Sequence, residues 1–299
     1  MGEIAMDDIQ LLFATPMQLG ECPLWHPEEE ALYWIDIAGL AVHRHDVASG
    51  AHASWTLPSE PGCIARSANG GMIVAMRSGV ALLDTQTGSL TALAPAPYDA
   101  TKMRFNDGRC DAAGRFWAGT LYEPRDQAAG SLFCVERGTI RDAAKPVTVS
   151  NGLAFSVDNR ILYHADTTAH RITAYDFDVT TGDIGNGRLF KQFSTDRSQK
   201  YGGRPDGAAV DSENAYWCAM YEGGRILRLS PSGDILREIA LPLRCPTMVA
   251  FGGPDLRTLF ITSARHNRPS AELAQHPLSG CLLALRVDVP GHPEPAYIP

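Results

Sequence analysis

The chain has 299 residues, of which 44% are hydrophobic and 20% charged, a composition that can bury a large core and excludes an intrinsically disordered protein. Its formal net charge of -8 argues against a nucleic-acid partner, because a phosphate backbone requires a basic surface. No apolar segment approaches the length that spans a bilayer, so we expect no membrane partner either.

The N-terminal residues and the cysteines both indicate a cytoplasmic protein. The first ten residues carry several acids and contain no basic region followed by an apolar run, so no secretory signal is expected. Seven cysteines are scattered along the chain, and none of them forms a CxxC pair. An odd number of scattered cysteines favours packed, reduced thiols over a disulfide framework or a zinc site.

An apolar and aromatic segment preceded by a turn recurs six times along the chain. The copies start at residues 31, 71, 114, 160, 214 and 257, so successive copies are 40 to 54 residues apart. Four units also contain a polar turn with a glycine, at residues 46–50, 84–88, 179–183 and 230–234. Such turns are typical of β-hairpins, because glycine readily adopts positive φ and Asp, Ser or Thr caps the turn.

This repeat predicts an all-β fold, a six-bladed β-propeller with about four antiparallel strands in each blade. A period in the forties leaves room for four short strands per unit, and six such units fill a single domain over residues 1–299. A long β-sandwich is the alternative, but it would not explain six equal units. A closed propeller brings the equivalent positions of all its units together around one axis.

Four polar side chains occupy equivalent positions, 11 to 13 residues before an aromatic residue of their unit. They are Glu21, Asn106, Asn151 and Asp206, which precede Trp34, Trp117, Tyr163 and Trp217 respectively. The second and sixth units have Gly62 or Cys63 and Thr247 instead. Asn-Gly and Asp-Gly are also common turn pairs, so each residue alone would more often form a turn. Their coincidence in four repeats, and the presence of a glutamate among them, favours a site.

The chemistry of these side chains indicates one divalent metal ion. Carboxylates that meet at a narrow channel repel one another and are costly to desolvate unless a cation lies between them. Oxygen ligands favour Ca²⁺, Mg²⁺ or Mn²⁺, although Zn²⁺ and Fe²⁺ also accept carboxylates, so the metal is not identified. Three or four protein ligands leave coordination positions for water and substrate, as in a catalytic site.

The chain resembles the SMP-30/gluconolactonase/luciferin-regenerating enzyme-like family, which includes regucalcin and bacterial aldonolactonases. The matching motifs lie in order at residues 19–25, 32–37, 104–109, 114–120, 150–156, 204–211 and 251–263. The resemblance implies a six-bladed propeller with one metal bound by Glu21, Asn151 and Asp206. It also implies substrate contacts from Arg104 and Asn106, with Glu123 as the nearest candidate for a third. Position 22, often glycine in the family, is Cys22 here.

The function expected from this resemblance is hydrolysis of a sugar lactone to the aldonic acid by a monomeric enzyme. The metal would act as a Lewis acid on the lactone carbonyl, and Asp206 would also accept a proton from the attacking water. Two alternatives remain open. One is a phosphotriesterase or paraoxonase-like hydrolase, since the same Lewis acid polarises a phosphoryl oxygen. The other is a calcium-binding or ligand-binding protein without catalysis, like regucalcin.

Overall fold

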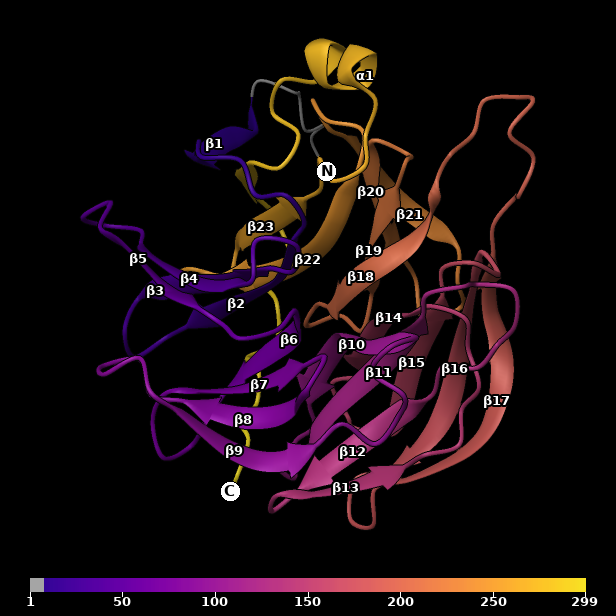
Figure 1. Ribbon diagram of the computed structural model, residues 1–299. Helices are drawn as coiled ribbons and strands as arrows, with labels where there is room; N and C mark the ends of the chain where they lie inside the picture. Colours follow the sequence, from indigo (N-terminus) through magenta and orange to yellow (C-terminus); the bar gives the residue numbers. More distant parts are fainter. Residues whose placement is uncertain (1–7) are drawn as a thin grey trace.

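The computed structural model describes residues 8–299, which form six four-stranded antiparallel sheets arranged around a central axis (Figure 1). The predicted six-bladed β-propeller is therefore confirmed. The first three blades contain β2 (Gly20–His26), β3 (Ala31–Asp36), β4 (Ala41–Asp46) and β5 (His52–Thr56); β6 (Pro61–Arg66), β7 (Met72–Met76), β8 (Gly79–Leu83) and β9 (Leu90–Pro95); and β10 (Met103–Cys110), β11 (Phe116–Tyr122), β12 (Leu132–Glu136) and β13 (Thr139–Asp142).

The last three blades follow the same strand order, except that the sixth takes its outer strand from the start of the chain. They contain β14 (Ser150–Phe155), β15 (Ile161–Asp166), β16 (Arg171–Asp178) and β17 (Asp183–Gln192); β18 (Arg204–Val210), β19 (Tyr216–Tyr221), β20 (Arg225–Leu229) and β21 (Ile235–Ala240); and β22 (Pro246–Gly252), β23 (Thr258–Ser263), β24 (Leu282–Arg286) and β1 (Gln10–Phe13). Residue Gln10 of β1 pairs with Ala284 of β24. This pairing closes the ring and covers what would otherwise be an exposed sheet edge.

The aromatic residues of the repeat pack the blades, as their periodicity predicts. Trp34, Trp117 and Trp217 lie on the second strands and are at most 1% exposed. The indole Nε1 of Trp117 donates to Asp111 at 2.8 Å, and that of Trp217 donates to Asp211 at the same distance. A buried indole N–H requires an acceptor, so in these two units an aspartate in the preceding turn stabilises the tryptophan.

Two further aspartates, at the ends of second strands, fix the segments that lead into innermost strands. Asp36 accepts hydrogen bonds from the backbone N–H groups of Gln18 and Leu19, just before β2. Asp166 accepts equivalent bonds from Thr148 and Val149, just before β14. These bonds give Asp36 and Asp166 a structural role, since they set where β2 and β14 begin.

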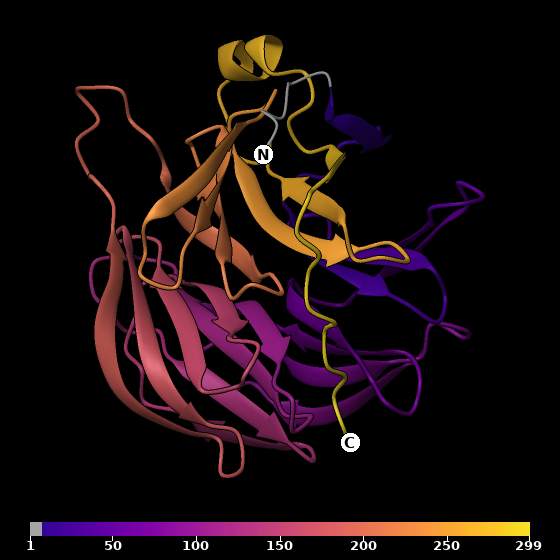
Figure 2. The same cartoon turned by 180° about the vertical axis from the view of Figure 1, so that it is seen from behind.

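The C-terminal segment crosses one face of the propeller. Figure 2 shows it from behind, running over the central axis. Tyr297 is fully buried, and its phenol oxygen accepts a hydrogen bond from the backbone N–H of Gly138 at 2.9 Å. Glu294 forms an ion pair with Arg109 of β10. We call this end of the axis the base, and the C-terminal segment closes it.

The cysteines are packed as thiols, as the sequence predicts. All seven cysteines are free thiols and all are buried. The single helix of residues 8–299, α1 (Ser270–Gln275), lies between β23 and β24, and no helix in that range is long and apolar enough to cross a membrane.

Candidate metal and substrate site

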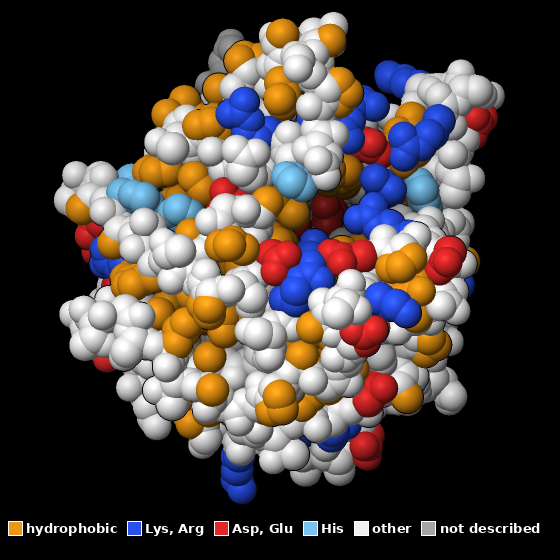
Figure 3. All heavy atoms as spheres, viewed as in Figure 1, with side chains coloured by type: hydrophobic (Ala, Val, Ile, Leu, Met, Phe, Trp, Pro, Cys, Tyr) orange, Lys and Arg blue, Asp and Glu red, His pale blue; other side chains and the backbone are white. Residues whose placement is uncertain are grey.

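A cavity of about 700 Å³ opens at the end of the axis opposite the base, and Figure 3 shows charged side chains gathered around this hollow. We call it the mouth cavity. Every predicted site residue lines it, namely Glu21, Arg104, Asn106, Glu123, Asn151 and Asp206. Residues from all six blades meet here, which is the convergence that a closed ring of repeats predicts.

The innermost strands are locally bent where they carry these side chains. The pairing register shifts between Glu21 and Leu24 in β2, between Asn151 and Ala154 in β14, and between Pro205 and Ala208 in β18. A bulge of this kind re-aims a side chain relative to the pleat. All six innermost strands contain such a shift, so the bend belongs to the repeat, whereas the polar side chain belongs to only some units.

Two residues that follow predicted metal ligands show the backbone geometry of these bends. Gly152 has a φ of +58°, and a Cβ there would lie 2.3 Å from the phenol oxygen of Tyr216, so only glycine fits. Cys22 has a φ of +47°, an uncommon value for a residue with a side chain. Its thiol is anchored by the backbone of Ile64, which donates to the sulfur at 3.3 Å. The departure from glycine at position 22 is therefore accommodated beside Glu21.

A chain of hydrogen bonds connects blades three, four and five across the floor of the cavity. Arg104 Nη1 donates to Asn106 Oδ1 at 2.8 Å, and Asn106 Nδ2 donates to Asn151 Oδ1 at 2.8 Å. Asn151 Nδ2 in turn donates to Thr167 Oγ1 at 2.8 Å, and Thr167 donates to the carbonyl of Pro205 at 2.7 Å. This network orients the amide oxygen of Asn151 and joins it to the residue that precedes Asp206.

Three buried carboxylates, those of Glu21, Asp206 and Asp107, have raised pKa values. Burial raises the pKa of Glu21 well above its usual value, and Asp206 and Asp107 raise it further. Burial, followed by the charge of Asp107, does the same to Asp206. Burial raises the pKa of Asp107 to about 6, and its Oδ1 is buried without a hydrogen-bond partner in the described residues. Such a cluster favours either protonation or a bound cation.

The donors at this position fit a divalent cation. Glu21, Asn151 and Asp206 supply two carboxylates and one amide oxygen, which is the chemistry that hard cations prefer. Within residues 8–299 no cluster of three or more His, Cys, Asp or Glu side chains has metal-binding geometry. A soft, sulfur-rich or histidine-rich centre therefore has no counterpart in that range, and an oxygen site would depend on the amide of Asn151.

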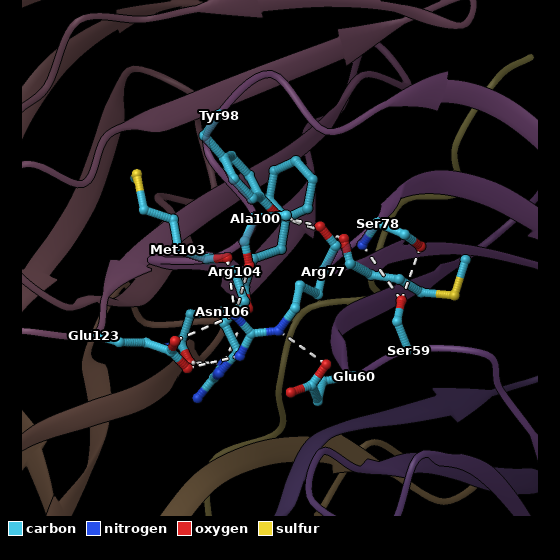
Figure 4. Close-up of polar contacts among 12 residues, drawn as sticks. Ser59, Glu60, Arg77, Ser78, Tyr98, Ala100, Met103, Arg104, Asn106 and Glu123 are labelled. Atoms are coloured by element: carbon cyan, nitrogen blue, oxygen red, sulfur yellow. Dashed lines mark hydrogen bonds and ion pairs between the residues drawn. The ribbon is translucent and has the colours of Figure 1, made fainter.

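Glu123 reaches the mouth cavity, but it is paired there. Its carboxylate accepts hydrogen bonds from Arg77 at 2.6 and 3.2 Å, and Arg77 also binds Glu60 at 2.9 Å (Figure 4). The side chain of Glu123 is 40% exposed, whereas Arg104 and Asn106 are below the surface. Glu123 thus lies at the rim, in an ion-pair group with Arg77 and Glu60.

Several residues that line the cavity are not predicted by the repeat pattern of the sequence. Arg77 and Glu60 come from the second unit, whose slot residues Gly62 and Cys63 are not among the residues that line the cavity. Arg204 begins the motif at residues 204–211 and lies two residues before Asp206. Thr167 follows the aspartate that ends β15, and its position in the repeat was the signal that could have revealed it. Thr247 of the sixth unit donates to the carbonyl of Gly20 and so packs β22 against β2.

The chain is similar to known proteins over most of its length. The model of the SMP-30/Gluconolactonase/LRE-like region matches residues 19–265. The chain is 49% identical to the 6-deoxy-6-sulfogluconolactonase of Pseudomonas putida, over 97% of this chain and 99% of that protein. It is 32% identical to regucalcin of Gallus gallus, over 91% and 92% of the two chains.

The fold has a close counterpart among solved structures. The crystal structure of a calcium-binding protein, regucalcin from Agrobacterium tumefaciens str. C58, superposes with a TM-score of 0.91 at 30% identity and covers 96% of each chain. The resemblance inferred from the motifs is thereby confirmed, and the expected lactonase class agrees with the named activity of the bacterial relative. The chain belongs to the SMP-30/gluconolactonase/LRE-like family.

Proposed function

We propose that this protein is a metal-dependent lactonase that hydrolyses a sugar lactone to the open-chain acid. The observation that carries the proposal is the convergence of two buried carboxylates without an ion-pair partner in residues 8–299 and an oriented amide oxygen at the floor of the mouth cavity. The 49% identity to a lactonase over nearly the whole of both chains supports the reaction class.

Glu21, Asn151 and Asp206 would hold the metal, and the calcium binding ascribed to the Agrobacterium regucalcin supports a divalent ion. A divalent cation at this position would polarise the lactone carbonyl and stabilise the developing oxyanion. The cation would also cancel the repulsion between Glu21 and Asp206, which lie in a site shielded from water.

The protein's own groups have separate tasks in this mechanism. A carboxylate oxygen of Asp206 accepts a proton from the water that attacks the carbonyl carbon. The ring C–O bond then breaks, the leaving ring oxygen takes that proton from Asp206 and becomes the alcohol, and the former carbonyl carbon remains as the acid. Arg104 and Asn106 bind the sugar hydroxyls or ring oxygen, since both line the cavity beside the metal ligands. Their mutual hydrogen bond fixes their orientation before substrate binds.

The substrate class can be narrowed from the relative and the cavity. The Pseudomonas putida enzyme is named for 6-deoxy-6-sulfogluconolactone, a gluconolactone with a sulfonate at carbon 6. A cavity of about 700 Å³ accepts a hexonolactone with such a substituent. We therefore propose glucono-type lactones as the first substrates to test.

The test is lactone hydrolysis measured by pH-stat, with chelator-treated protein resupplied with Ca²⁺, Mg²⁺, Mn²⁺, Zn²⁺ or Fe²⁺ one at a time. Gluconolactone, 6-deoxy-6-sulfogluconolactone, galactonolactone and xylonolactone form the panel. We expect turnover only with metal, and the best pair identifies both substrate and cofactor. Absence of turnover for every lactone with every metal would overturn the proposal.

A second candidate, a calcium-binding protein without catalysis, is favoured by the regucalcin relatives. The Agrobacterium protein is described as calcium-binding, and it matches this chain over 96% of its length. Tight Ca²⁺ binding by calorimetry, combined with no hydrolysis of any lactone in the panel, would favour this alternative over the lactonase.

A further inference from the structure

The mouth cavity has a surplus of positive charge on one side. Its lining contains five arginines and four carboxylates, and two of those carboxylates are the proposed metal ligands Glu21 and Asp206. On the blade-two side, Arg77 pairs with both Glu60 and Glu123, so this group carries no positive surplus. Once a divalent cation balances Glu21 and Asp206, the remaining arginines of the lining face the cavity with no carboxylate of the lining to match them.

On the opposite side, three arginines share one carboxylate. Glu222, which follows β19, lies 2.7 Å from Arg197, 3.2 Å from Arg204 and 3.0 Å from Arg268. Arg268 also has its own partner, since it binds Glu272 through two nitrogens at 2.7 and 2.6 Å. Arg197 and Arg204 therefore divide the single charge of Glu222, and this cluster keeps a net positive charge.

Arg204 is the member of this cluster with an unused donor. It contacts Glu222 only through Nη2, its Nη1 makes no hydrogen bond within residues 8–299, and its side chain is 21% exposed where it lines the cavity. Its guanidinium lies over the ring of Tyr221, 5.2 Å from the centroid, which holds it in one orientation. An acceptor on a ligand in the cavity would pair with this free donor of the guanidinium and so stabilise the bound ligand.

Arg204 lies on the same strand as Asp206, the proposed proton acceptor. It is the first residue of β18 and comes two residues before Asp206, and both side chains line the cavity. A lactone whose carbonyl lies at Asp206 would extend its remaining carbons over this part of the wall.

We propose that Arg204 forms an anion subsite that binds a sulfonate or phosphate on the carbon remote from the lactone carbonyl, and so determines substrate specificity. This inference rests on the proposed lactonase function. Tetrahedral oxyanions suit a guanidinium, whose planar N–H groups bind two oxygens at once. Arg104 is less suited to the task, because it already donates to Asn106 and to the carbonyl of Phe105.

The test compares kcat/KM for gluconolactone, 6-deoxy-6-sulfogluconolactone and 6-phosphogluconolactone in wild type, Arg204→Gln and Arg204→Lys. We expect wild type to prefer an anionic lactone, and Arg204→Gln to lower that preference by about 10- to 100-fold through KM. Arg204→Lys should restore part of it, since the charge remains but the bidentate geometry is lost. The preferred anionic lactone identifies the group as sulfonate or phosphate.

The matched control is Arg188→Gln, which removes an arginine on β17 that is 55% exposed and pairs with Asp176 away from the cavity. Its preference should equal that of wild type. If Arg204→Gln also keeps the wild-type preference, or if wild type treats all three lactones alike, the anion subsite is overturned while the lactonase proposal stands.

Binding provides a readout that does not depend on turnover. The product analogue 6-deoxy-6-sulfogluconate is titrated into wild type and Arg204→Gln by calorimetry, with gluconate as the uncharged-tail control. Tighter binding of the sulfonated acid to wild type, lost in Arg204→Gln, supports the subsite even if no lactone is hydrolysed. Equal affinities in the two proteins would overturn it.

Discussion

The two ends of the propeller axis differ in whether their buried charges are paired. Strand β10 sends Arg104 to the mouth cavity and Arg109 to the base, and both side chains are 8% exposed. At the base, Arg109 donates to the carbonyls of Leu153 and Ala208 at 3.0 and 2.6 Å and pairs with Glu294. At the mouth, Arg104 has no carboxylate partner within residues 8–299, and burial lowers its pKa to about 10.

The carboxylates show the same contrast. Glu21 and Asp206 form no ion pair with any residue of the described range, although both are almost fully buried. The buried charge of the base is thus paired within the protein, whereas Arg104, Glu21 and Asp206 at the mouth have no ion-pair partner in residues 8–299. Unbalanced buried charge is costly to stability, and it is typical of functional sites.

The largest expected effect comes from Asp206→Asn at the mouth. Turnover of the best lactone should fall by about 10³-fold or more, since this change removes both a metal ligand and the proton acceptor. The melting temperature of the metal-free protein should stay level or rise, because a repelling charge is lost. Calorimetric metal binding, pH-stat activity and thermal unfolding measure the three effects. Wild-type turnover would end the catalytic assignment.

The converse change at the base is Glu294→Gln. We expect the free energy of unfolding to fall by about 3–5 kcal/mol, because the guanidinium of Arg109 remains buried without its partner. KM for the lactone should not change. Urea unfolding provides the measurement, and Glu238→Gln, which removes an exposed ion pair with Arg225, is the control with an expected loss of about 1 kcal/mol or less. Equal losses in both variants would contradict the contrast between the ends.

The pH dependence of stability tests the hydrogen bond between His164 and Ser150, the residue before Asn151. His164 is 2% exposed and hydrogen-bonds Ser150 at 2.7 Å, and burial lowers its pKa to about 4. A depressed pKa means that the folded state resists protonation, so stability is present above about pH 6.5 and is lost as the pH falls toward 4, by about 3 kcal/mol. His164→Gln should flatten this part of the stability profile, measured by urea unfolding between pH 4 and 7. A profile as steep as wild type would exclude His164 as the cause.

The smallest expected effect is that of Thr167→Val. The variant keeps the side-chain shape but removes the bond to Asn151 Nδ2, so the amide oxygen loses part of its orientation. Metal affinity should fall by about 10-fold, with the fold intact. Calorimetric titration of the metal measures it, and Thr91→Val on the outer strand of blade two serves as the control. An unchanged affinity would show that Asn106 alone orients Asn151.

Much of the fold and of the site could be predicted because the propeller is a repeat. Equivalent positions of a closed repeat meet at one axis, so Glu21, Asn106, Asn151 and Asp206 were found without knowledge of any contact. Arg77 and Arg204 could not be found in this way. Arg77 follows β7, in a unit that has no polar side chain at the position equivalent to Glu21. The charge balance of Arg204 depends on its ion pair with Glu222, which follows the next strand.

The sequence by itself determined the six units, the closed ring and the polar floor of the mouth cavity, because the 40- to 54-residue period and the side-chain types are local properties of the chain. Only the tertiary structure decided which charges are balanced. Whether an arginine meets a carboxylate depends on rotamers and on loops from neighbouring blades, such as the C-terminal segment that brings Glu294 to Arg109. Charge balance is a property of distances between residues far apart in the chain, and no periodicity records it.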